Sequence, residues 1–385
     1  MAGIEGALRL RVRWDGRRVN AVEIASTRAV GASRVLEGKT PREAAALVPM
    51  LFSLCGRAQG VAAMRAWEAA LGIAPDERAA RARDWAVAAE AVQENLWRLL
   101  LDWPVGLGEA PATEEFAVWR RRLSALTAAL MQAQGWREPG HAVAAPEREL
   151  AAAGAELSRW LASALLGTDV PGWLAERALD DWWNRGETPA ARVTRRLFKG
   201  EGLAGGSAVR LLQASPKAME RMLERTLREA EYAARPDWEG EARETGALAR
   251  MAGHPAVARA LESHGNCVAV RVLARLVETA ALALRLAGRA GAALADGSAM
   301  AGGAGAAWVE TSRGLLAHVV AIEDGRITRY RILAPTEWNF HPDGAFALGL
   351  AGTEADSESG LRRALHLQAL ALDPCVAYEA VVDHA

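Results

Sequence analysis

The chain has 385 residues, with 46 basic and 47 acidic side chains, which gives a formal net charge of −1. This balance argues against nucleic acid and against an anionic membrane surface as partners. The most apolar stretch, residues 268–291, is interrupted by charged side chains, so we expect no membrane-spanning helix. The length suits one large domain or two ordinary ones.

The amino terminus lacks the apolar core of a signal peptide. The three cysteines, Cys55, Cys267 and Cys375, form no plausible disulfide framework. Reduced thiols are typical of the cytosol, so we expect a cytoplasmic protein.

Two stretches have the pattern of a β-hairpin, one near each end of the chain. Residues 8–24 alternate apolar and polar side chains around Asp15-Gly16, and residues 318–333 do so around Asp324-Gly325. An Asp-Gly pair between two alternating runs predicts a two-residue type I′ turn. We expect both hairpins to contribute to one small sheet that joins the ends of the chain.

The sequence between the hairpins has a helical pattern. Thr40, Pro41 and Glu43 form a capping-box signature at the start of one helix. The Gly/Ala-rich residues 291–310 predict a loop or flexible crossover. Further helices are expected at residues 76–103, 146–167, 216–236, 254–263, 267–288 and 358–374.

Together these patterns predict an α+β fold, mainly α, dominated by a long-helix bundle with a small sheet made from the N-terminal and C-terminal hairpins. No break in composition requires a domain boundary, so we expect a single domain over residues 1–385. Its expected parts are an N-terminal hairpin (1–30), the helical bundle (31–290), the crossover (291–310), and a hairpin followed by a C-terminal motif helix (311–385).

Two of the cysteines stand in positions that resemble halves of a metal-binding pair. Cys55 lies in "SLCGRAQG" and Cys375 in "LDPCVAYEA", but Ala58 and Tyr378 occupy the third position after each. Thiolates bind soft metals such as iron, nickel and zinc, whereas closed structural sites usually need four ligands. Each cysteine alone is more typical of a small buried apolar residue than of a metal ligand. The basic run from Arg192 to Lys199 is interpreted as a solvated face that a protein partner could use.

Several stretches, taken in order, resemble the large subunit of nickel–iron hydrogenases. Residues 31–56 resemble that family's "GFE" segment leading into "RICGVC", and residues 244–250, "ETGALAR", resemble "EVGPLAR". Residues 310–339, "ETSRGLLAHVVAIEDGRITRYRILAPTEWN", and the tail motif "DPC" at 373–375 continue the resemblance. It spans nearly the whole chain, and it implies a large-subunit-like fold.

The departures from this family concern the metal ligands. The resemblance implies that two C-x-x-C pairs supply four thiolates in the enzymes, and that the second cysteine of each pair bridges nickel to an iron carrying cyanide and CO. Here Cys55 and Cys375 match the first cysteines, while Ala58 and Tyr378 replace the bridging ones.

The positions associated with proton relay and with the ends of the motifs also differ. Ser33 stands at the place of the "GFE" glutamate, and a serine cannot relay a proton as a carboxylate can. Ala62 and Val381 replace the histidines that close the two motifs. These changes argue against a working hydrogenase, so we expect the protein not to be an enzyme.

The surroundings of the diatomic ligands look retained. By resemblance, Arg313 matches the arginine over the metal site, Thr336 matches a hydroxyl that binds cyanide, and Asp373 of "DPC" is present. Cyanide nitrogens accept hydrogen bonds, which suits a guanidinium and a hydroxyl. A purely structural role for these residues, holding sheet and turn together, is equally compatible.

This pattern is similar to the hydrogenase accessory proteins of the HupK/HoxV type. The resemblance implies a scaffold that transiently holds iron with its cyanide and CO ligands, without stable nickel, and passes it to the hydrogenase large subunit. It also implies partners: small maturation chaperones of the HypC/HupF type, other hydrogenase maturation proteins and the large-subunit precursor. The alternative is a metal-free platform that binds maturation factors, in which Cys55 and Cys375 are only core residues.

Overall fold

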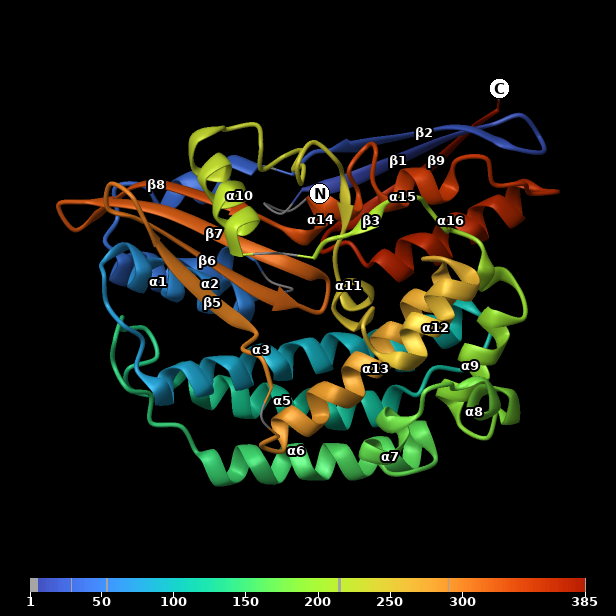
Figure 1. Cartoon of the computed structure of the whole chain (residues 1–385), viewed down its shortest axis with the longest axis horizontal. Coiled ribbons are helices and arrows are strands. Elements are labelled where there is room, and N and C mark those ends of the chain that lie inside the picture. The colour runs from blue at the N-terminus through green and yellow to red at the C-terminus, as the bar shows by residue number, and fades with distance from the viewer. Residues whose placement is uncertain (1–5, 29, 53–54, 214–215, 290, 385) are drawn as a thin grey trace.

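The computed structural model describes residues 6–28, 30–52, 55–213, 216–289 and 291–384. A layer of long helices lies beneath a layer of sheets and short helices (Figure 1). The strands are β1 (Ala7–Trp14), β2 (Val19–Ser26), β3 (Arg210–Leu211), β4 (Arg243–Glu244), β5 (Ala295–Met300), β6 (Ala304–Thr311), β7 (Gly314–Glu323), β8 (Arg326–Leu333) and β9 (Ala377–His384).

The helices divide into a few long ones that build the bundle and many short ones that surround it. They are α1 (Pro41–Leu51), α2 (Gly56–Ala70), α3 (Glu77–Trp97), α4 (Trp103–Gly106), α5 (Thr113–Gln132), α6 (Glu147–Leu161), α7 (Val170–Ala175), α8 (Asp180–Arg185), α9 (Pro189–Phe198), α10 (Pro216–Arg228), α11 (Ala247–Met251), α12 (Pro255–His264), α13 (Val268–Leu286), α14 (Pro335–Asn339), α15 (Ala345–Leu350) and α16 (Glu358–Leu372). Short turns of tighter or wider helix are η1 (Val30–Leu36), η2 (Arg98–Asp102), η3 (Ala162–Leu166) and η4 (Glu201–Leu203).

Helix α13 is the centre of the bundle. It contacts α3, α6, α11, α12 and α16, and most of its side chains are buried on every side. A helix surrounded in this way can be apolar around its whole circumference, which explains the high hydropathy of residues 268–291. In the described part of the chain, no helix is both long and apolar enough to cross a bilayer.

The two predicted hairpins form, but they belong to different sheets. β1 and β2 pair in a three-stranded sheet of order β2-β1-β9, whereas β7 and β8 belong to a four-stranded antiparallel sheet of order β5-β6-β7-β8. The prediction of one sheet made from both hairpins was therefore wrong. The ends of the chain are joined instead by β9, which runs parallel to β1 from Ala7↔Ala377 to Trp14↔His384.

Only the second hairpin turn has the predicted backbone. Asp324 and Gly325 both have positive φ, 50° and 73°, as a type I′ turn requires. At the first turn only Gly16 has positive φ, 94°. There the Asp15 carboxylate accepts hydrogen bonds from the backbone N–H groups of Arg17 and Arg18, which stabilises a longer loop.

The Gly/Ala-rich residues 291–310 do not form the predicted loop, since β5 and β6 pair within them. Helix α2 packs directly on these strands. A Cβ atom at Gly305 would lie 2.2 Å from the backbone nitrogen of Ala70 and 2.4 Å from the oxygen of Ala66. Small side chains are required here because the backbone of the helix approaches the sheet so closely. Gly and Ala therefore replace the larger residues from which a strand is usually predicted.

The predicted capping box is confirmed. Thr40 Oγ1 accepts from the Glu43 N–H, and the Glu43 carboxylate accepts from the Thr40 N–H. The helix predicted at 76–103 begins after Asp76 as expected, but its regular α-helical part ends at Trp97. A wider turn, η2, follows and carries Arg98 and Asp102 toward the sheet layer.

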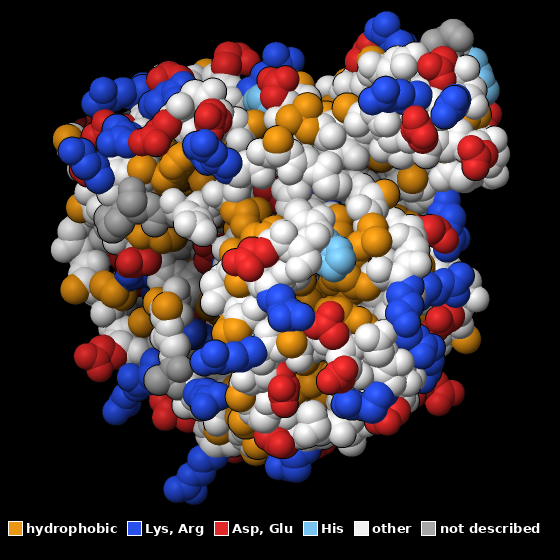
Figure 2. Space-filling model, turned by 45° about the vertical axis from the view of Figure 1, so that its right-hand side comes forward, with side chains coloured by type: hydrophobic (Ala, Val, Ile, Leu, Met, Phe, Trp, Pro, Cys, Tyr) orange, Lys and Arg blue, Asp and Glu red, His pale blue; other side chains and the backbone are white. Residues whose placement is uncertain are grey.

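The surface carries charges of both signs with no large area of one sign on the face shown in Figure 2, which fits the net charge of −1. The basic run predicted to be a solvated face lies on and just after α9. Arg192, Arg196 and Lys199 are exposed there, at the spacing of one helix face.

A candidate metal centre with two thiols

Cys375 lies between the last helix and the last strand. Helix α16 ends at Asp373, which adopts a left-handed conformation with φ 54°, and β9 begins two residues after Cys375. The Cys375 N–H donates to Thr336 Oγ1 at 3.2 Å, and Thr336 Oγ1 lies 3.0 Å from Cys375 Sγ. Since that oxygen already accepts from the N–H, its own hydrogen is available to the sulfur. Thr336 thus fixes the position of the buried thiol.

Asp373, next in this segment, is completely buried among three guanidinium groups. Its carboxylate accepts from Arg98 at 2.7 and 3.0 Å and from Arg275 at 3.2 Å, and Arg313 Nε lies 3.4 Å away. Burial alone would raise the pKa of Asp373, but the charges of Arg313, Arg98 and Arg275 outweigh it and hold this pKa well below its ordinary value. Asp373 is therefore an anion at neutral pH.

Arg313 lies in the tight turn between β6 and β7. Its Nη2 donates to Glu94 Oε2 at 2.8 Å, whereas its buried Nε has no hydrogen-bond partner among the described residues. Burial opposes the charge on Arg313, but Asp373 and Glu94 outweigh it and raise its pKa. The turn needs Gly314, because a Cβ there would lie 2.4 Å from Thr245 Cγ2. Arg313 thus places a fixed cation beside Asp373, with an Nε–H that makes no hydrogen bond among the described residues.

Cys55 lies immediately before the first turn of α2. The Glu90 carboxylate caps that helix by accepting from the backbone N–H groups of Arg57 and Ala58. Burial, followed by the charges of Cys375 and Glu90, raises the pKa of the partly buried Cys55 thiol to about 12. The effect of Cys375 on the pKa of Cys55 indicates that the two thiols lie within electrostatic range of one another.

A chain of hydrogen bonds from the four-stranded sheet ends on Cys55. Gln59 Nε2 lies 3.4 Å from Cys55 Sγ, Gln59 Oε1 lies 2.8 Å from His318 Nε2, and His318 Nδ1 lies 2.7 Å from the Tyr330 hydroxyl. Burial lowers the pKa of His318 to about 3, so the ring is neutral and its Nε2 carries the proton that Gln59 accepts. The Gln59 amide group is thereby oriented to donate to the sulfur.

The positions of the missing family ligands have other roles here. Ala58 is buried in α2, and Tyr378 lies on β9 with its hydroxyl 2.9 Å from His366 Nδ1. Ser33 is buried and donates to the backbone oxygen of Tyr330. Val381 pairs with Arg11 in the register of β9 against β1. None of these side chains has the chemistry of a thiolate or a proton-relaying carboxylate.

Of the five residues expected to form the site, Cys375 contacts Thr336 and Asp373 contacts Arg313 directly, and Cys55 lies within electrostatic range of Cys375 and Arg313. Within the described ranges, no group of three or more His, Cys, Asp or Glu side chains is arranged to hold a metal ion. The protein thus offers two sulfur atoms together with hydrogen-bond donors from Arg313, Thr336 and Gln59. Such a donor set fits a metal fragment that brings most of its own ligands, and it does not fit a bare ion that needs four protein ligands.

The pattern of charges in the long helices could have identified part of this network. Arg271, Arg275 and Glu278 are spaced four and three residues apart in α13, so they share one face of an otherwise apolar helix. Such charges need partners inside the protein: Arg271 binds Glu244, Arg275 binds Asp373, and Glu278 binds Arg250.

Known proteins resemble the chain over nearly its whole length. The family model for nickel-dependent hydrogenases matches residues 213–377. The hydrogenase expression/formation protein HoxV of Cupriavidus necator is 34 % identical, over 92 % of this chain and 91 % of that protein. The hydrogenase expression/formation protein HupK of Rhizobium leguminosarum bv. viciae is 33 % identical, over 95 % and 93 %.

Solved structures of hydrogenases share the fold. The nickel–iron–selenium hydrogenase of Desulfovibrio vulgaris Hildenborough superimposes with a TM-score of 0.65, covering 93 % of each chain at 16 % identity. That of Desulfomicrobium baculatum gives a TM-score of 0.67 over 96 % of each chain at 15 % identity. The predicted large-subunit-like fold is thus confirmed. The chain belongs to the family of hydrogenase expression/formation proteins of the HoxV/HupK type.

Proposed function

We propose that this protein is a hydrogenase maturation factor that transiently holds iron with its cyanide and CO ligands and passes it to the hydrogenase large subunit. Its relatives are named hydrogenase expression/formation proteins, which supports a role in maturation. The observation that carries the finer proposal is the meeting of two thiols, Cys55 and Cys375, beside the hydrogen-bond donors of Arg313 and Thr336.

The ligand count favours a carrier over a permanent holder. Two sulfur atoms leave positions on iron for diatomic ligands that arrive with it. In the proposed complex Cys55 and Cys375 would bind the iron, the Arg313 Nε–H would donate to a cyanide nitrogen, and the Thr336 hydroxyl would donate to another after turning away from Cys375 Sγ. A fragment held by two protein ligands is released more readily than one held by four.

The same features argue that the protein does not turn over hydrogen. Ala58 and Tyr378 cannot bridge two metals, and Ser33 is hydrogen-bonded to a backbone carbonyl and carries no carboxylate. We expect the purified protein, loaded in a maturing host, to give no hydrogen-dependent dye reduction. Hydrogen turnover by a preparation free of true large subunit would contradict this part of the proposal.

A metal-free platform for maturation factors is the second candidate, and one observation favours it. Glu94 and Asp373 surround the Arg313 side chain, and Thr336 is hydrogen-bonded to Cys375, so both residues already have partners within the fold. In this case Arg313 and Thr336 hold the turn and the tail together, and the chain presents its surface to the small chaperones and the large-subunit precursor.

Substitution of the thiols in a hydrogenase-producing host separates the two candidates. We expect Cys55→Ala and Cys375→Ala each to abolish or strongly reduce hydrogenase maturation, measured as active hydrogenase per cell. Cys267→Ala is the matched control: Cys267 is also buried, but it precedes α13 and is expected to leave maturation unchanged. Normal maturation with the double variant Cys55→Ala/Cys375→Ala, at normal protein level, would favour the platform and contradict the carrier.

A further inference from the structure

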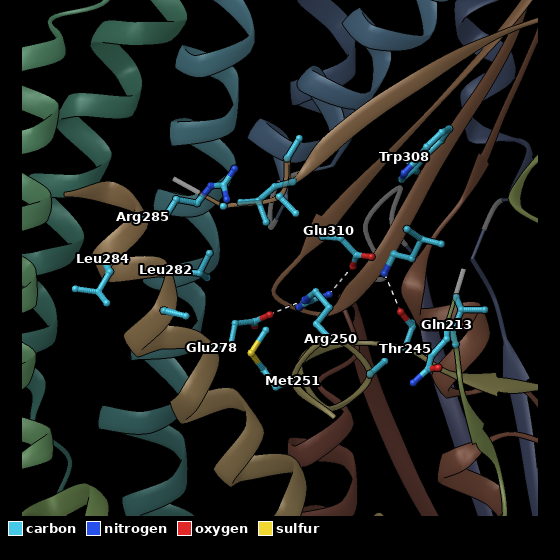
Figure 3. A pocket seen from close by; sticks show the side chains of 18 of the residues that line it. Gln213, Thr245, Arg250, Met251, Glu278, Leu282, Leu284, Arg285, Trp308 and Glu310 are labelled. Carbon is cyan, nitrogen blue, oxygen red and sulfur yellow. Dashed lines mark hydrogen bonds and ion pairs between the residues drawn. The ribbon is translucent and has the colours of Figure 1, made fainter. Parts of the chain in front are cut away.

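A cavity lies where the helical bundle meets the four-stranded sheet. It has a volume of about 930 Å³ and is bounded by α11, α13, β6 and residues 291–294. Figure 3 shows Leu282, Leu284 and Arg285 of α13 on one side and Trp308 of β6 on the other. This volume falls in the range of cavities that bind small organic molecules.

The floor of the cavity is an ion pair network that is already complete. Arg250 donates to Glu278 at 2.5 Å, to Glu310 at 2.6 Å and to the Thr311 carbonyl at 2.7 Å, as Figure 3 shows for the two carboxylates. Glu278 also accepts from Asn95, which accepts from Arg275. The lining of the cavity contains neither thiol and none of Arg313, Thr336 and Asp373, so the cavity is distinct from the site described above.

The polar groups of the cavity that have no hydrogen-bond partner are N–H donors. Arg285 gives its Nε to Asp84, but its terminal amino groups have no hydrogen-bond partner among the described residues. The exposed Arg289 side chain and the Trp308 indole N–H likewise have none there. Three arginines and two glutamates line the cavity: Arg250 engages both glutamates, Arg285 forms an ion pair with Asp84, and the exposed Arg289 has no ion pair among the described residues. The unused capacity therefore suits a ligand with an acceptor group and a negative charge.

The walls are mostly apolar. Leu174, Met251, Leu282, Leu284 and Leu294 line them, and Trp308 provides an aromatic surface. An apolar body would gain free energy by displacing water from these side chains. We propose that this cavity binds a small organic anion, with an apolar or aromatic body among the leucines and Trp308 and one acidic group at Arg285 and Arg289.

Two fluorescent probes of nearly equal shape test this proposal on the full-length protein. The anionic probe is 8-anilinonaphthalene-1-sulfonate, and its neutral counterpart is N-phenyl-1-naphthylamine. We expect saturable binding of the anionic probe with one site per chain, and binding of the neutral probe that is weaker by about fivefold or more, in line with the loss of one charge-assisted hydrogen bond. Equal affinity for both probes would overturn the assignment of an anionic ligand.

Substitutions locate the site. Arg285→Gln/Arg289→Gln should weaken binding of the anionic probe about fivefold and leave the neutral probe unaffected. Ala292→Trp, in the exposed segment that lines the cavity, should block both probes. The matched controls are Arg121→Gln and Ala110→Trp, at exposed positions outside the cavity, and both should bind like the unmodified chain.

The cavity proposal can be contradicted independently of the iron proposal. Absence of saturable binding, or binding that none of the cavity variants changes although circular dichroism shows them folded, would overturn it. Cys55→Ala/Cys375→Ala should bind the anionic probe normally, since the cavity is separate from the thiols. A failure of the iron proposal would therefore leave the cavity proposal standing, and the reverse also holds.

Discussion

Cys375 and Cys55 meet at one site, but they are anchored to different parts of the molecule. The Cys375 side, defined as Asp373 to Cys375, is fixed to the helical bundle by Arg98 and Arg275 and to the β6–β7 turn by Arg313. The Cys55 side is fixed by a cap from Glu90 and by the amide group of Gln59.

Because of this difference, the residues that stabilise the fold can be distinguished from those that affect mainly the proposed metal site. The buried Arg275 and Arg313 and the partly buried Arg98 require the Asp373 anion, so the Cys375 side is part of the core electrostatics of the fold. The Cys55 side depends on neutral and capping hydrogen bonds, whose loss costs less free energy. In the proposed carrier Cys375 would be the fixed ligand, and changes around Cys55 would affect the site with smaller effects on the fold.

The largest effect is expected from Asp373→Asn. The variant leaves Arg98, Arg275 and Arg313 without their shared carboxylate, and breaking a buried ion network of this kind costs about 3–5 kcal/mol of unfolding free energy. Denaturant titration followed by circular dichroism measures it. The control is Asp383→Asn, an exposed partner of Arg11, which should cost less than about 1 kcal/mol. Equal losses of unfolding free energy for both variants would contradict the view that the Cys375 side is part of the core of the fold.

Gln59→Leu tests the Cys55 side. The substitution removes the donor to Cys55 and leaves the buried His318 Nε2–H without its acceptor, which should cost about 1–3 kcal/mol. The same denaturant titration applies, with the exposed Gln132 substituted by Leu as the control. A loss larger than that of Asp373→Asn would reverse the proposed order of the two sides.

Glu90→Gln should have a smaller effect. The amide oxygen can still accept one of the two N–H groups at the start of α2, so the loss is about 1 kcal/mol. Thermal unfolding compared with Glu147→Gln, an exposed change in the first turn of α6, measures it. No difference between the two variants would mean that the Glu90 cap does not support Cys55.

Short sequence patterns correctly predicted features that depend on neighbouring residues alone. The Thr40 capping box, the second Asp-Gly turn and the last helix depend on neighbouring residues, and all three form as expected. The convergence of Cys55 and Cys375 could be expected only through the family resemblance, because 320 positions separate them in the chain (375 − 55).

What the sequence did not predict depends on long-range packing. Strands β5 and β6 were interpreted as a loop because close packing against α2 replaces the usual strand residues with Gly and Ala. Asp373 could not be named as the partner of Arg98 and Arg275 because both arginines lie far from it in the chain and only the fold brings them together. The hydrogen bonds from Tyr330 through His318 to Gln59 join β8, β7 and α2, so no short sequence pattern predicts them.

The smallest effect on stability, and the largest on function, is expected from Cys55→Ala. Removing one partly buried sulfur should change the unfolding free energy by no more than about 1 kcal/mol. Thermal unfolding of Cys55→Ala and Cys267→Ala, compared with the unmodified chain, checks that both variants are folded before the metal content is examined.

Infrared spectroscopy of the protein purified from a hydrogenase-maturing host tests the central claim most directly. We expect absorption bands in the cyanide and CO stretching region for the unmodified chain and for Cys267→Ala, and their loss in Cys55→Ala and in Cys375→Ala. Absence of these bands from intact, folded protein, or their persistence in both cysteine variants, would contradict the proposal that Cys55 and Cys375 hold the iron fragment.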